Sequence, residues 1–427
     1  MTLSADLWDR SLWYATAKEP DPGSDAPEDA QVLVIGGGFT GLSTALHLAE
    51  RGVAVTLIEA EKIGFGASGR NGGQVIPGLK IDPAEMRARW GAEAGGRLVE
   101  FAGGAADRVF DLIERHGIAC AATRQGWIQG AHSAKALRAV HGRAREWERE
   151  GAPVEIYDAD AMAEATGTRI YHGGWRDLRA GLVNPLSYAR GLARAARAAG
   201  VRIVTGARAM AVLREGAGWR VDLGGSSLRG QTVVMATNAY NDRLMPRMAR
   251  SILPVQSSIV ATEPLPEAVA ATILPQGACC SETRKLAFYY RLTQDRRLVI
   301  GGRGATGPVY STGLQDALEQ GMRRLFPQIA DARVDMAWSG HLALTMDHLP
   351  HIHEPEPGLW AVAAYNGRGV AMATAMGAAL ADRLAEGTPL PLPETPIRPI
   401  GWHALRGPVM DIGVRYYWMK DRLGFAS

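Results

Sequence analysis

Cysteine is scarce in this chain of 427 residues, which contains only Cys120, Cys279 and Cys280. Three cysteines with this spacing match neither a disulfide framework nor a zinc knuckle, so the sequence favours a reducing compartment. An excess of one charge is also missing, because 47 Lys and Arg residues stand against 44 Asp and Glu residues, for a net charge of +3. Such a small charge on this length gives no indication of a nucleic-acid partner.

Long apolar runs are missing as well. No stretch of about 18 apolar residues occurs, so we expect no membrane-spanning helix. Residues 1–8 lack the charged and apolar regions of a signal peptide, and we therefore expect a cytoplasmic protein. Hydrophobic residues still make up 47% of the chain and charged residues 21%, which is typical of a globular protein, and the length predicts two domains.

A glycine-rich turn near the N-terminus carries the strongest functional signal. The apolar run 32–35 ends in Gly36, Gly38 and Gly41, which have the spacing G-x-G-x-x-G, and a helix-like pattern follows. A second apolar run then ends in Glu59. Together these features predict a dinucleotide-binding βαβ unit, with a pyrophosphate at the helix N-terminus and the acid on the ribose hydroxyls. The alternative is a glycine turn in an ordinary α/β domain.

Two further glycine-rich segments could contact a flat polar ring. The loop 64–74 would supply many free N–H donors, and Gly367-Arg368-Gly369 precedes a second helix whose N-terminus could favour a reduced, anionic flavin. Taken alone, these segments are equally compatible with a surface loop and a plain turn. Arg303 ends a strand and could bind a substrate carboxylate, or form an ordinary ion pair.

Two other clusters carry weaker signals. His348, His351 and His353 have the spacing H-x-x-H-x-H, but Pro350 and a second proline interrupt any helix, so we expect a polar loop and no metal site. Aromatic and basic residues alternate over 402–422. This tail could form an amphipathic helix on a membrane surface, although a helix docked on the protein core is the expected arrangement.

Several further motifs along the chain are more specific than the glycine-rich turn. They are Ser11-Leu12-Trp13-Tyr14, Gly66-Ala67-Ser68-Gly69-Arg70-Asn71-Gly72-Gly73, Tyr290-Arg291-Leu292-Thr293, Gly301-Gly302-Arg303, Trp338-Ser339-Gly340, Thr345-Met346-Asp347 and the turn 365–369. Over nearly its whole length the chain thus resembles the D-amino-acid-oxidase-like FAD oxidoreductases, and within them the γ-glutamylputrescine oxidase branch. One motif departs mildly, because the usual A-T-G turn is Ala236-Thr237-Asn238 here.

The resemblance implies an α/β fold with two domains. A Rossmann-like, glutathione-reductase-like FAD-binding domain would be built from discontinuous segments, and a substrate domain would contain a large mixed β-sheet. We assign 1–84, 152–250 and 335–427 to the FAD-binding domain, with the tail 400–427 docked on it, and 85–151 and 251–334 to the substrate domain.

The resemblance also implies oxidation of a C–N bond in an amine or amino-acid-like substrate. Hydride would pass to flavin N5 and water would hydrolyse the imine, which requires orientation more than a protein acid or base. Arg303, Asn366 and Tyr365 are the expected substrate-facing residues. The expected FAD-binding residues are Gly36, Gly38, Phe39, Thr40, Gly41, Glu59, Ala60, Ala67, Ser68, Gly69, Arg70, Asn71, Gly72, Gly73, Ala236, Thr237, Gly340, Gly367, Arg368, Gly369 and Val370.

Three departures from the related sarcosine oxidases refine this expectation. Gly340 takes the place of the cysteine that tethers their flavin, so we expect non-covalent FAD. Ala371 replaces a lysine that binds the substrate carboxylate, which disfavours small N-methyl amino acids. Val299 replaces a lysine that assists oxygen, so the electron acceptor is O2 or another compound. A dehydrogenase of another small substrate, such as a hydroxy acid, and a flavin-binding subunit without turnover remain alternatives.

Overall fold

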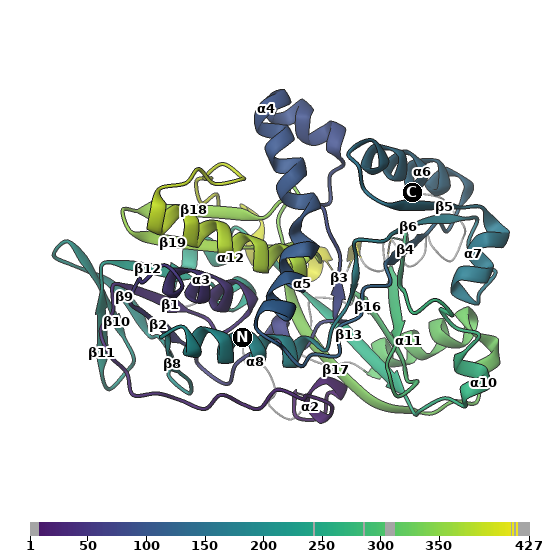
Figure 1. Cartoon of the computed structure of the whole chain (residues 1–427), viewed down its shortest axis with the longest axis horizontal. Coiled ribbons are helices and arrows are strands. Elements are labelled where there is room, and N and C mark those ends of the chain that lie inside the picture. The colour runs from purple at the N-terminus through teal and green to yellow at the C-terminus, as the bar shows by residue number, and fades with distance from the viewer. Residues whose placement is uncertain are drawn as a thin grey trace.

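The computed structural model describes residues 8–241, 244–284, 287–303, 312–410, 412–413 and 416. Six of its strands form a sheet in the order β18-β19-β12-β1-β2-β8, parallel except for the antiparallel pair β18–β19 (Figure 1). The strands of this sheet are β1 (Val32–Ile35), β2 (Val55–Ile58), β8 (Arg202–Val204), β12 (Thr232–Met235), β18 (His351–Glu356) and β19 (Leu359–Ala363).

Both faces of this sheet are covered, so every residue of β1 and β2 is buried, and only Thr56 among them is polar. Val32 and Val34 of β1 belong to a core shared with the helices α3 (Phe39–Ala49), α5 (Ala105–Arg115), α8 (Pro185–Ala198) and α12 (Gly369–Glu386). Leu33 and Ile35 point the other way, toward a small antiparallel sheet. That sheet consists of β9 (Ala211–Glu215), β10 (Gly218–Asp222) and β11 (Ser227–Gly230).

A second sheet has eight strands in the order β17-β13-β16-β15-β14-β4-β6-β5. It is mixed, because β14 and β4 run parallel while its other neighbours are antiparallel. Its strands are β4 (Trp127–Gly130), β5 (Val154–Tyr157), β6 (Gly174–Asp177), β13 (Leu253–Thr262), β14 (Cys279–Glu282), β15 (Phe288–Leu292), β16 (Leu298–Arg303) and β17 (Val334–Leu344). The helices around it are α6 (Ala134–Arg149), α7 (Ala159–Thr166), α10 (Glu267–Ala270) and α11 (Thr312–Leu325).

The remaining elements connect and flank the two sheets. They are α2 (Leu12–Ala15), α4 (Pro83–Gly103), α9 (Pro246–Ala249), the paired strands β3 (Gln74–Val75) and β7 (Gly181–Leu182), and the 3-10 turns η1 (Ala67–Gly69), η2 (Asn238–Tyr240), η3 (Pro327–Ile329) and η4 (His403–Leu405). The helix α4 projects from the top of the molecule in Figure 1. None of the helices within the described ranges is both long and apolar enough to cross a membrane.

The expected α/β fold with a large mixed sheet is confirmed, but strand pairing differs from the expected segment boundaries. Strands β5 and β6 fall in the segment 152–250, and β17 falls almost wholly in 335–427, yet all three pair within the eight-stranded sheet. Strands β5 and β6 have only four residues each, and β17 is longer but contains polar residues and a glycine, so local patterns gave little signal for their sheet partners. The division into an FAD-binding and a substrate module stays a proposal, with these three strands moved to the latter.

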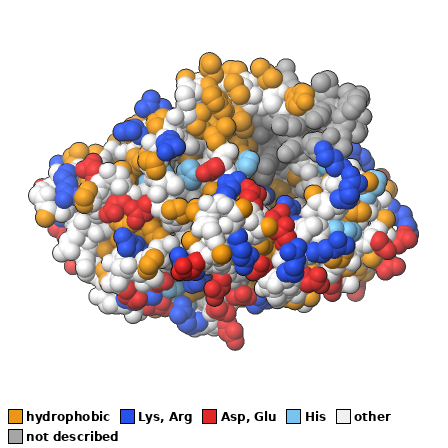
Figure 2. Space-filling model, turned by 90° about the horizontal axis from the view of Figure 1, so that it is seen from above, with side chains coloured by type: hydrophobic (Ala, Val, Ile, Leu, Met, Phe, Trp, Pro, Cys, Tyr) orange, Lys and Arg blue, Asp and Glu red, His pale blue; other side chains and the backbone are white. Residues whose placement is uncertain are grey.

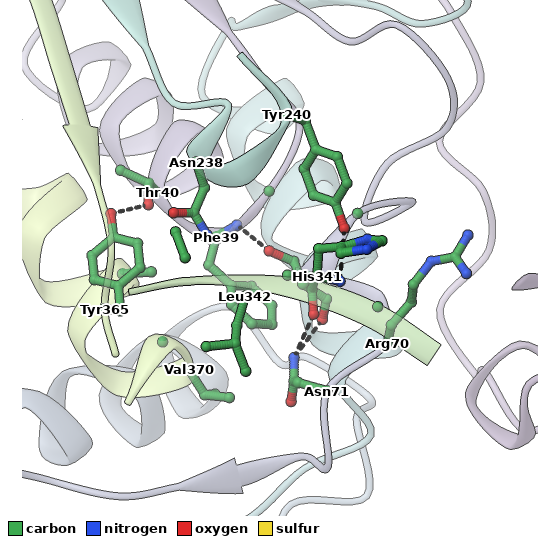
Figure 3. Close-up of a pocket in the computed structure, with 18 of the residues that line it drawn as sticks. Phe39, Thr40, Arg70, Asn71, Asn238, Tyr240, His341, Leu342, Tyr365 and Val370 are labelled. Atoms are coloured by element: carbon green, nitrogen blue, oxygen red, sulfur yellow. Dashed lines mark hydrogen bonds between the residues drawn. The ribbon is translucent and has the colours of Figure 1, made fainter. Parts of the chain in front are cut away.

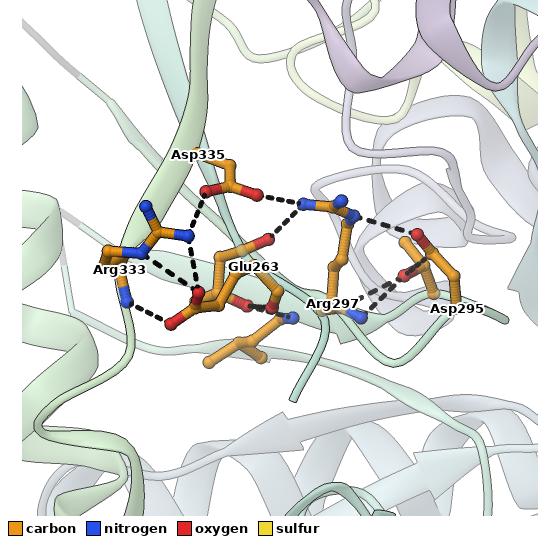
Figure 4. A network of polar contacts seen from close by, with 8 residues as sticks. Glu263, Asp295, Arg297, Arg333 and Asp335 are labelled. Atoms are coloured by element: carbon orange, nitrogen blue, oxygen red, sulfur yellow. Dashed lines mark hydrogen bonds and ion pairs between the residues drawn. The ribbon is translucent and has the colours of Figure 1, made fainter. Parts of the chain in front are cut away.

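Ion pairs join the ends of three strands of the large sheet (Figure 4). Arg297 contacts Asp295 and Asp335, each at 2.9 Å, and Arg333 contacts Glu263 at 2.9 Å and Asp335 at 3.8 Å. Elsewhere on the surface, positive and negative side chains are interspersed in the view of Figure 2, consistent with the near-balanced composition. Isolated surface pairs contribute little, but a network on one sheet edge favours a single register.

The start of the C-terminal tail is anchored beside β13. The ring of His403 is buried, and its Nε2 lies 3.0 Å from the backbone oxygen directly before β13. Farther along, the apolar side chains of Leu405, Val409 and Ile412 are exposed. The contact of His403 is thus with the segment before a strand of the eight-stranded sheet, whereas the tail 400–427 was expected on the FAD-binding domain. That expectation stays a prediction, since most of 411–427 lies outside the described residues.

The helices α3 and α12 pack so closely that side-chain hydroxyls of α3 donate hydrogen bonds to backbone oxygens of α12. Ser43 donates through Oγ to the oxygen of Thr374 at 2.7 Å, and Thr44 donates to the oxygen of Gly377 at 3.1 Å. A Cβ atom on Gly377 would lie 2.6 Å from the Thr40 oxygen, closer than real contacts allow. The glycine therefore sets the distance between the two helices.

We expect Gly377→Ala to destabilise the protein by about 1–3 kcal/mol, because the added methyl group must push α3 and α12 apart. Gly96→Ala in α4 is the matched control, since a Cβ there meets nothing within 4 Å. That change should be neutral or stabilising by up to about 1 kcal/mol. Thermal unfolding of both variants without added ligand tests this, and equal melting temperatures would contradict the account.

Candidate functional site

A cavity of about 630 Å³ lies between the two sheets. One end is lined by the turn between β1 and α3, and the other end by β4, β14 and β15 of the eight-stranded sheet. Strand β17 and the N-terminus of α12 form the walls between these ends, as Figure 3 shows in part. The cavity is thus built from segments that lie far apart in the sequence.

The glycine-rich turn leaves space and N–H donors at the first end. Gly36 has a φ of 117°, and a Cβ on it would lie 2.8 Å from the Ala236 oxygen. Gly38 lines the cavity, and a Cβ there would lie 2.8 Å from Oγ of Ser68. Gly38 is also the N-cap of α3 and provides no side-chain cap. The turn therefore offers a close approach to the positive end of α3, as an anionic phosphate requires.

Glu59 lies at the end of β2 beside this turn. Its Oε2 accepts a hydrogen bond from Gly37 N at 2.7 Å, and its Oε1 accepts one from Glu61 N at 2.9 Å. Burial raises the pKa of the carboxyl group, while these two hydrogen bonds lower it. Each oxygen keeps a lone pair that can accept a ribose hydroxyl.

The loop after β2 is held by its own side chains. Asn71 donates from Nδ2 to the oxygens of Ala67 and Ser68 at 3.1 and 2.9 Å, and its Oδ1 accepts from Gly73 N at 2.8 Å. Trp13 donates to the Asn71 oxygen at 2.7 Å and so ties the N-terminal helix α2 to the loop. The backbone of this loop is therefore fixed before any ligand binds.

Arg70 of the same loop is a buried cation in the cavity wall. It is 1% exposed, donates to the oxygens of Phe65 at 2.7 Å and Ser339 at 3.1 Å, and stacks over the Phe65 ring. Its Nη2 has no hydrogen-bond partner. Burial lowers its pKa to about 10, so the guanidinium stays charged at neutral pH. A buried donor of this kind favours a negative group beside it.

Two strained turns meet at the centre of the site. Asn238 and Ala364 have φ values of 48° and 68°, and Oδ1 of Asn238 accepts a hydrogen bond from Ala364 N at 3.0 Å. Asparagine tolerates this left-handed conformation, which explains how it can replace the glycine of the usual A-T-G turn. Oγ1 of Thr237, just before it, is buried without a partner.

The turn before α12 links its helix to the phosphate turn. Tyr365 Oη lies 2.5 Å from Oγ1 of Thr40 (Figure 3). The side chain of Asn366 bonds to the backbone and side chain of Thr345 and to the Ala364 oxygen. These hydrogen bonds brace the turn, so we expect Tyr365 and Asn366 to position the site more than to touch the reacting atoms.

Strand β17 contributes the wall opposite α12. Gly340 and Leu342 line the cavity, and a Cβ on Gly340 would lie 3.2 Å from the Arg70 side chain. His341 between them is buried, and burial together with the nearby Arg70 charge lowers its pKa to about 4. Its backbone N donates to Tyr240 Oη at 3.2 Å. The imidazole is therefore neutral at pH 7.

Most of the predicted FAD-binding residues line this cavity. They are Gly36, Gly38, Phe39, Thr40, Glu59, Ala60, Ala67, Ser68, Arg70, Asn71, Gly72, Ala236, Thr237, Gly340, Gly367, Arg368, Gly369 and Val370. Gly41, Gly69 and Gly73 are absent from the lining, because their backbones pack against other chain segments behind it. Arg303 ends β16 opposite Ser257, and its side chain lies outside what the structure describes.

Sequence patterns missed the far end of the cavity. Its lining there includes Gln74, Ile76, Lys80, Trp127, Gln129, Ser281, Glu282, Phe288 and Tyr289. These residues lie on β3, β4, β14, β15 and a loop, and no short motif joins them. Only the pairing of β14 with β4 brings Trp127 beside Ser281, to which its Nε1 donates at 2.9 Å.

The three cysteines, and the histidines His351 and His353, lie in structural parts of the protein and not in the lining of the cavity. All three cysteines are buried and free, and none is among the described residues that line the cavity. His351 contacts Asp347 at 3.1 Å, and His353 bonds through Nδ1 to the oxygen of Thr395. Within the described part of the chain, no group of three potential ligands could hold a metal ion.

These features fit FAD. The phosphate turn and Glu59 suit the adenosine diphosphate half, and the partnerless donor of Arg70 with the N-terminus of α12 suits the polar ring. A bound flavin would be held by backbone N–H groups and by non-covalent contacts, since no thiol of the described lining is within reach.

Comparisons with known proteins agree with this fit. Residues 31–383 match the family model "FAD dependent oxidoreductase". The chain is 32% identical to gamma-glutamylputrescine oxidoreductase of Escherichia coli (97% and 98% of the two chains covered) and 31% identical to a probable oxidoreductase, OrdL, of Rhizobium meliloti (99% and 100%). Its fold is similar to that of a glycine oxidase from Geobacillus kaustophilus, with a TM-score of 0.71, 23% identity and 88% and 99% coverage. The chain therefore belongs to the FAD-dependent oxidoreductase family that its motifs resemble, and its cofactor is FAD.

Proposed function

We propose that this enzyme oxidises a C–N bond in an extended amine or amino-acid-like substrate, similar to the one named for its E. coli relative. The observation that carries the proposal is the continuity of the cavity. It runs from the FAD-binding turn past β17 to a far end lined by Trp127, Gln129 and Tyr289. Its far end thus provides room for a substrate beyond the cofactor ring.

The bound flavin supplies the two-electron acceptor, and the chain supplies orientation and exclusion of water. The substrate C–N bond becomes C=N with loss of two electrons and two protons, and water then hydrolyses the product to a carbonyl compound and an amine. The carboxylates of the described lining are engaged: Glu59 with backbone N–H groups, Glu61 with Arg208, and Glu282 with Arg284. None of these carboxylates is therefore free to act as a general base, so we expect the amine to react in its neutral form and positioning to provide most of the catalysis.

The test is anaerobic mixing of the yellow holoenzyme with a panel of amines, amino acids and hydroxy acids. We expect an extended amine to bleach the flavin absorbance and to yield an aldehyde or ammonia. Bleaching only by hydroxy acids would replace the proposal with a hydroxy-acid dehydrogenase. No bleaching by any compound would favour a flavin-binding subunit without turnover. Repeating the reaction in air shows whether O2 reoxidises the flavin. This comparison is needed because Val299, at the position of the oxygen-assisting lysine, lies in a buried apolar cluster.

We expect acid precipitation of the holoenzyme to release all of its flavin into the supernatant, because Gly340 offers no side chain for a covalent bond and no described cysteine lines the cavity. Absorbance of supernatant and pellet measures this. Yellow colour that stays with the washed pellet would show a covalent bond and would contradict the prediction.

We expect Arg70→Met to lower the midpoint potential of the bound flavin by about 30–60 mV, because a charged hydrogen bond contributes about 1.5–3 kcal/mol and favours the reduced, anionic ring. Arg70→Lys keeps the charge and should give a smaller shift. Spectroelectrochemical titration of the variants and the wild type measures the potentials. An unchanged potential in Arg70→Met would show that the cation does not face the ring.

A further inference from the structure

Arg368 is a second buried arginine in the cavity wall, and it lies apart from Arg70. Arg368 is the N-cap residue of α12, and it is 9% exposed. The guanidinium stacks over the ring of Trp127 with its Cζ 4.7 Å from the centroid, and Nη1 donates to the oxygen of Pro77. Both contacts lie on the far side of the cavity, so the guanidinium extends away from the phosphate turn toward β4.

No acidic side chain of the described residues forms an ion pair with this arginine. The two nearest acids, Asp82 and Asp177, raise its pKa only through space, and each is already paired. Asp82 contacts Arg143 at 2.6 Å, and Asp177 contacts Arg179 at 2.7 Å. Three arginines therefore share two aspartates, which leaves one positive charge in this wall.

An uncompensated buried cation is costly unless an anion approaches it. Burial lowers the pKa of Arg368 to about 10, so the group remains charged at neutral pH. Only one hydrogen bond from its side chain is present, and its stacking on Trp127 fixes the plane of the remaining donors. A planar, oriented guanidinium is suited to two parallel hydrogen bonds with a carboxylate.

The surroundings distinguish a substrate group from the cofactor as this anion. The guanidinium contacts Trp127 of β4, which in turn donates to Ser281 of β14, and the neighbouring Gln129 of β4 accepts from Arg143 and from Trp175 of β6. These strands belong to the far end of the cavity, whereas the phosphate turn and Glu59 lie at the opposite end. Sequence patterns placed Arg368 with the flavin only because it stands between two glycines.

We propose that Arg368 binds a carboxylate of the substrate, remote from the C–N bond that is oxidised. The inference rests on the proposed function and adds to it that the preferred substrates are amines with a distal carboxylate.

Binding of unreactive probes tests the proposal without turnover. The probes are the α,ω-dicarboxylates from malonate to pimelate and the corresponding neutral diamides, titrated into the holoenzyme and followed by the flavin absorption spectrum. We expect at least one dicarboxylate to bind the wild type and its diamide to bind far more weakly. Arg368→Met should weaken dicarboxylate binding about 10- to 100-fold and leave FAD affinity unchanged, and Arg368→Lys should restore part of the binding.

Arg214→Met is the matched control. Arg214 also stacks on a tryptophan, Trp219, and donates to a proline oxygen, that of Pro357, but it lies on β9 outside the cavity lining. This variant should bind the dicarboxylates like the wild type. Equal binding by wild type and Arg368→Met, no binding of any dicarboxylate to the wild type, or loss of FAD along with the dicarboxylate would overturn the proposal.

The amine panel separates this proposal from the proposed function. With a neutral amine and an amine of equal length that bears a terminal carboxylate, such as hexylamine and 6-aminohexanoate, Arg368→Met should raise KM only for the second. Reduction of the flavin by amines with no such split would refute the role of Arg368 alone. A dicarboxylate effect without flavin reduction by any amine would refute C–N oxidation alone.

Discussion

The close packing of α3 on α12 is the constraint on which the site depends. Because Gly377 leaves no gap beside Thr40, the two helices cross with backbone and hydroxyl groups in contact. Their N-termini then line one cavity although Phe39 and Gly369 are far apart in the chain. The Tyr365–Thr40 hydrogen bond closes the same contact at the level of the turns. The distance between α3 and α12 thus fixes the position of the phosphate turn relative to the far end of the cavity.

Local patterns predicted residues for the FAD half of the cavity in detail and gave no signal for its far end. The turn at Gly36 and Gly38 and the acid Glu59 follow from a motif of fewer than 30 residues, in which each residue type has its own physical reason. The mixed sheet and the family also followed, through the resemblance. Trp127 had no such signal, because it reaches the cavity only when β4 pairs with β14, a contact between segments 150 residues apart.

Two residues show what a motif does not specify, and their predicted roles stay predictions. Arg368 stands in a glycine turn typical of flavin contact, and its side chain stacks on Trp127. Asn366 lines the cavity as expected, and its amide also braces Thr345. In both cases the sequence identifies the turn, but the direction of the side chain depends on a distant partner.

The electrostatic character of the cavity follows from buried arginines. Arg70 and Arg368 both lie in its wall, neither forms an ion pair with an acid of the described residues, and burial lowers both pKa values to about 10. Such charges are tolerable when ligands supply the counter-charge, here an anionic cofactor at one end and, as proposed, a carboxylate at the other. The folded protein thus carries an unfavourable desolvation free energy at these two arginines, which the binding of anionic ligands offsets.

A crystal structure of the holoenzyme tests the central claim most directly. We expect pyrophosphate oxygens within hydrogen-bond distance of backbone N–H groups at the N-terminus of α3, and the flavin ring between Gly340 and the N-terminus of α12. The far end of the cavity, beside Trp127, should remain free of cofactor atoms. A flavin ring that fills this far end, or a pyrophosphate away from the α3 N-terminus, would contradict the proposed binding mode.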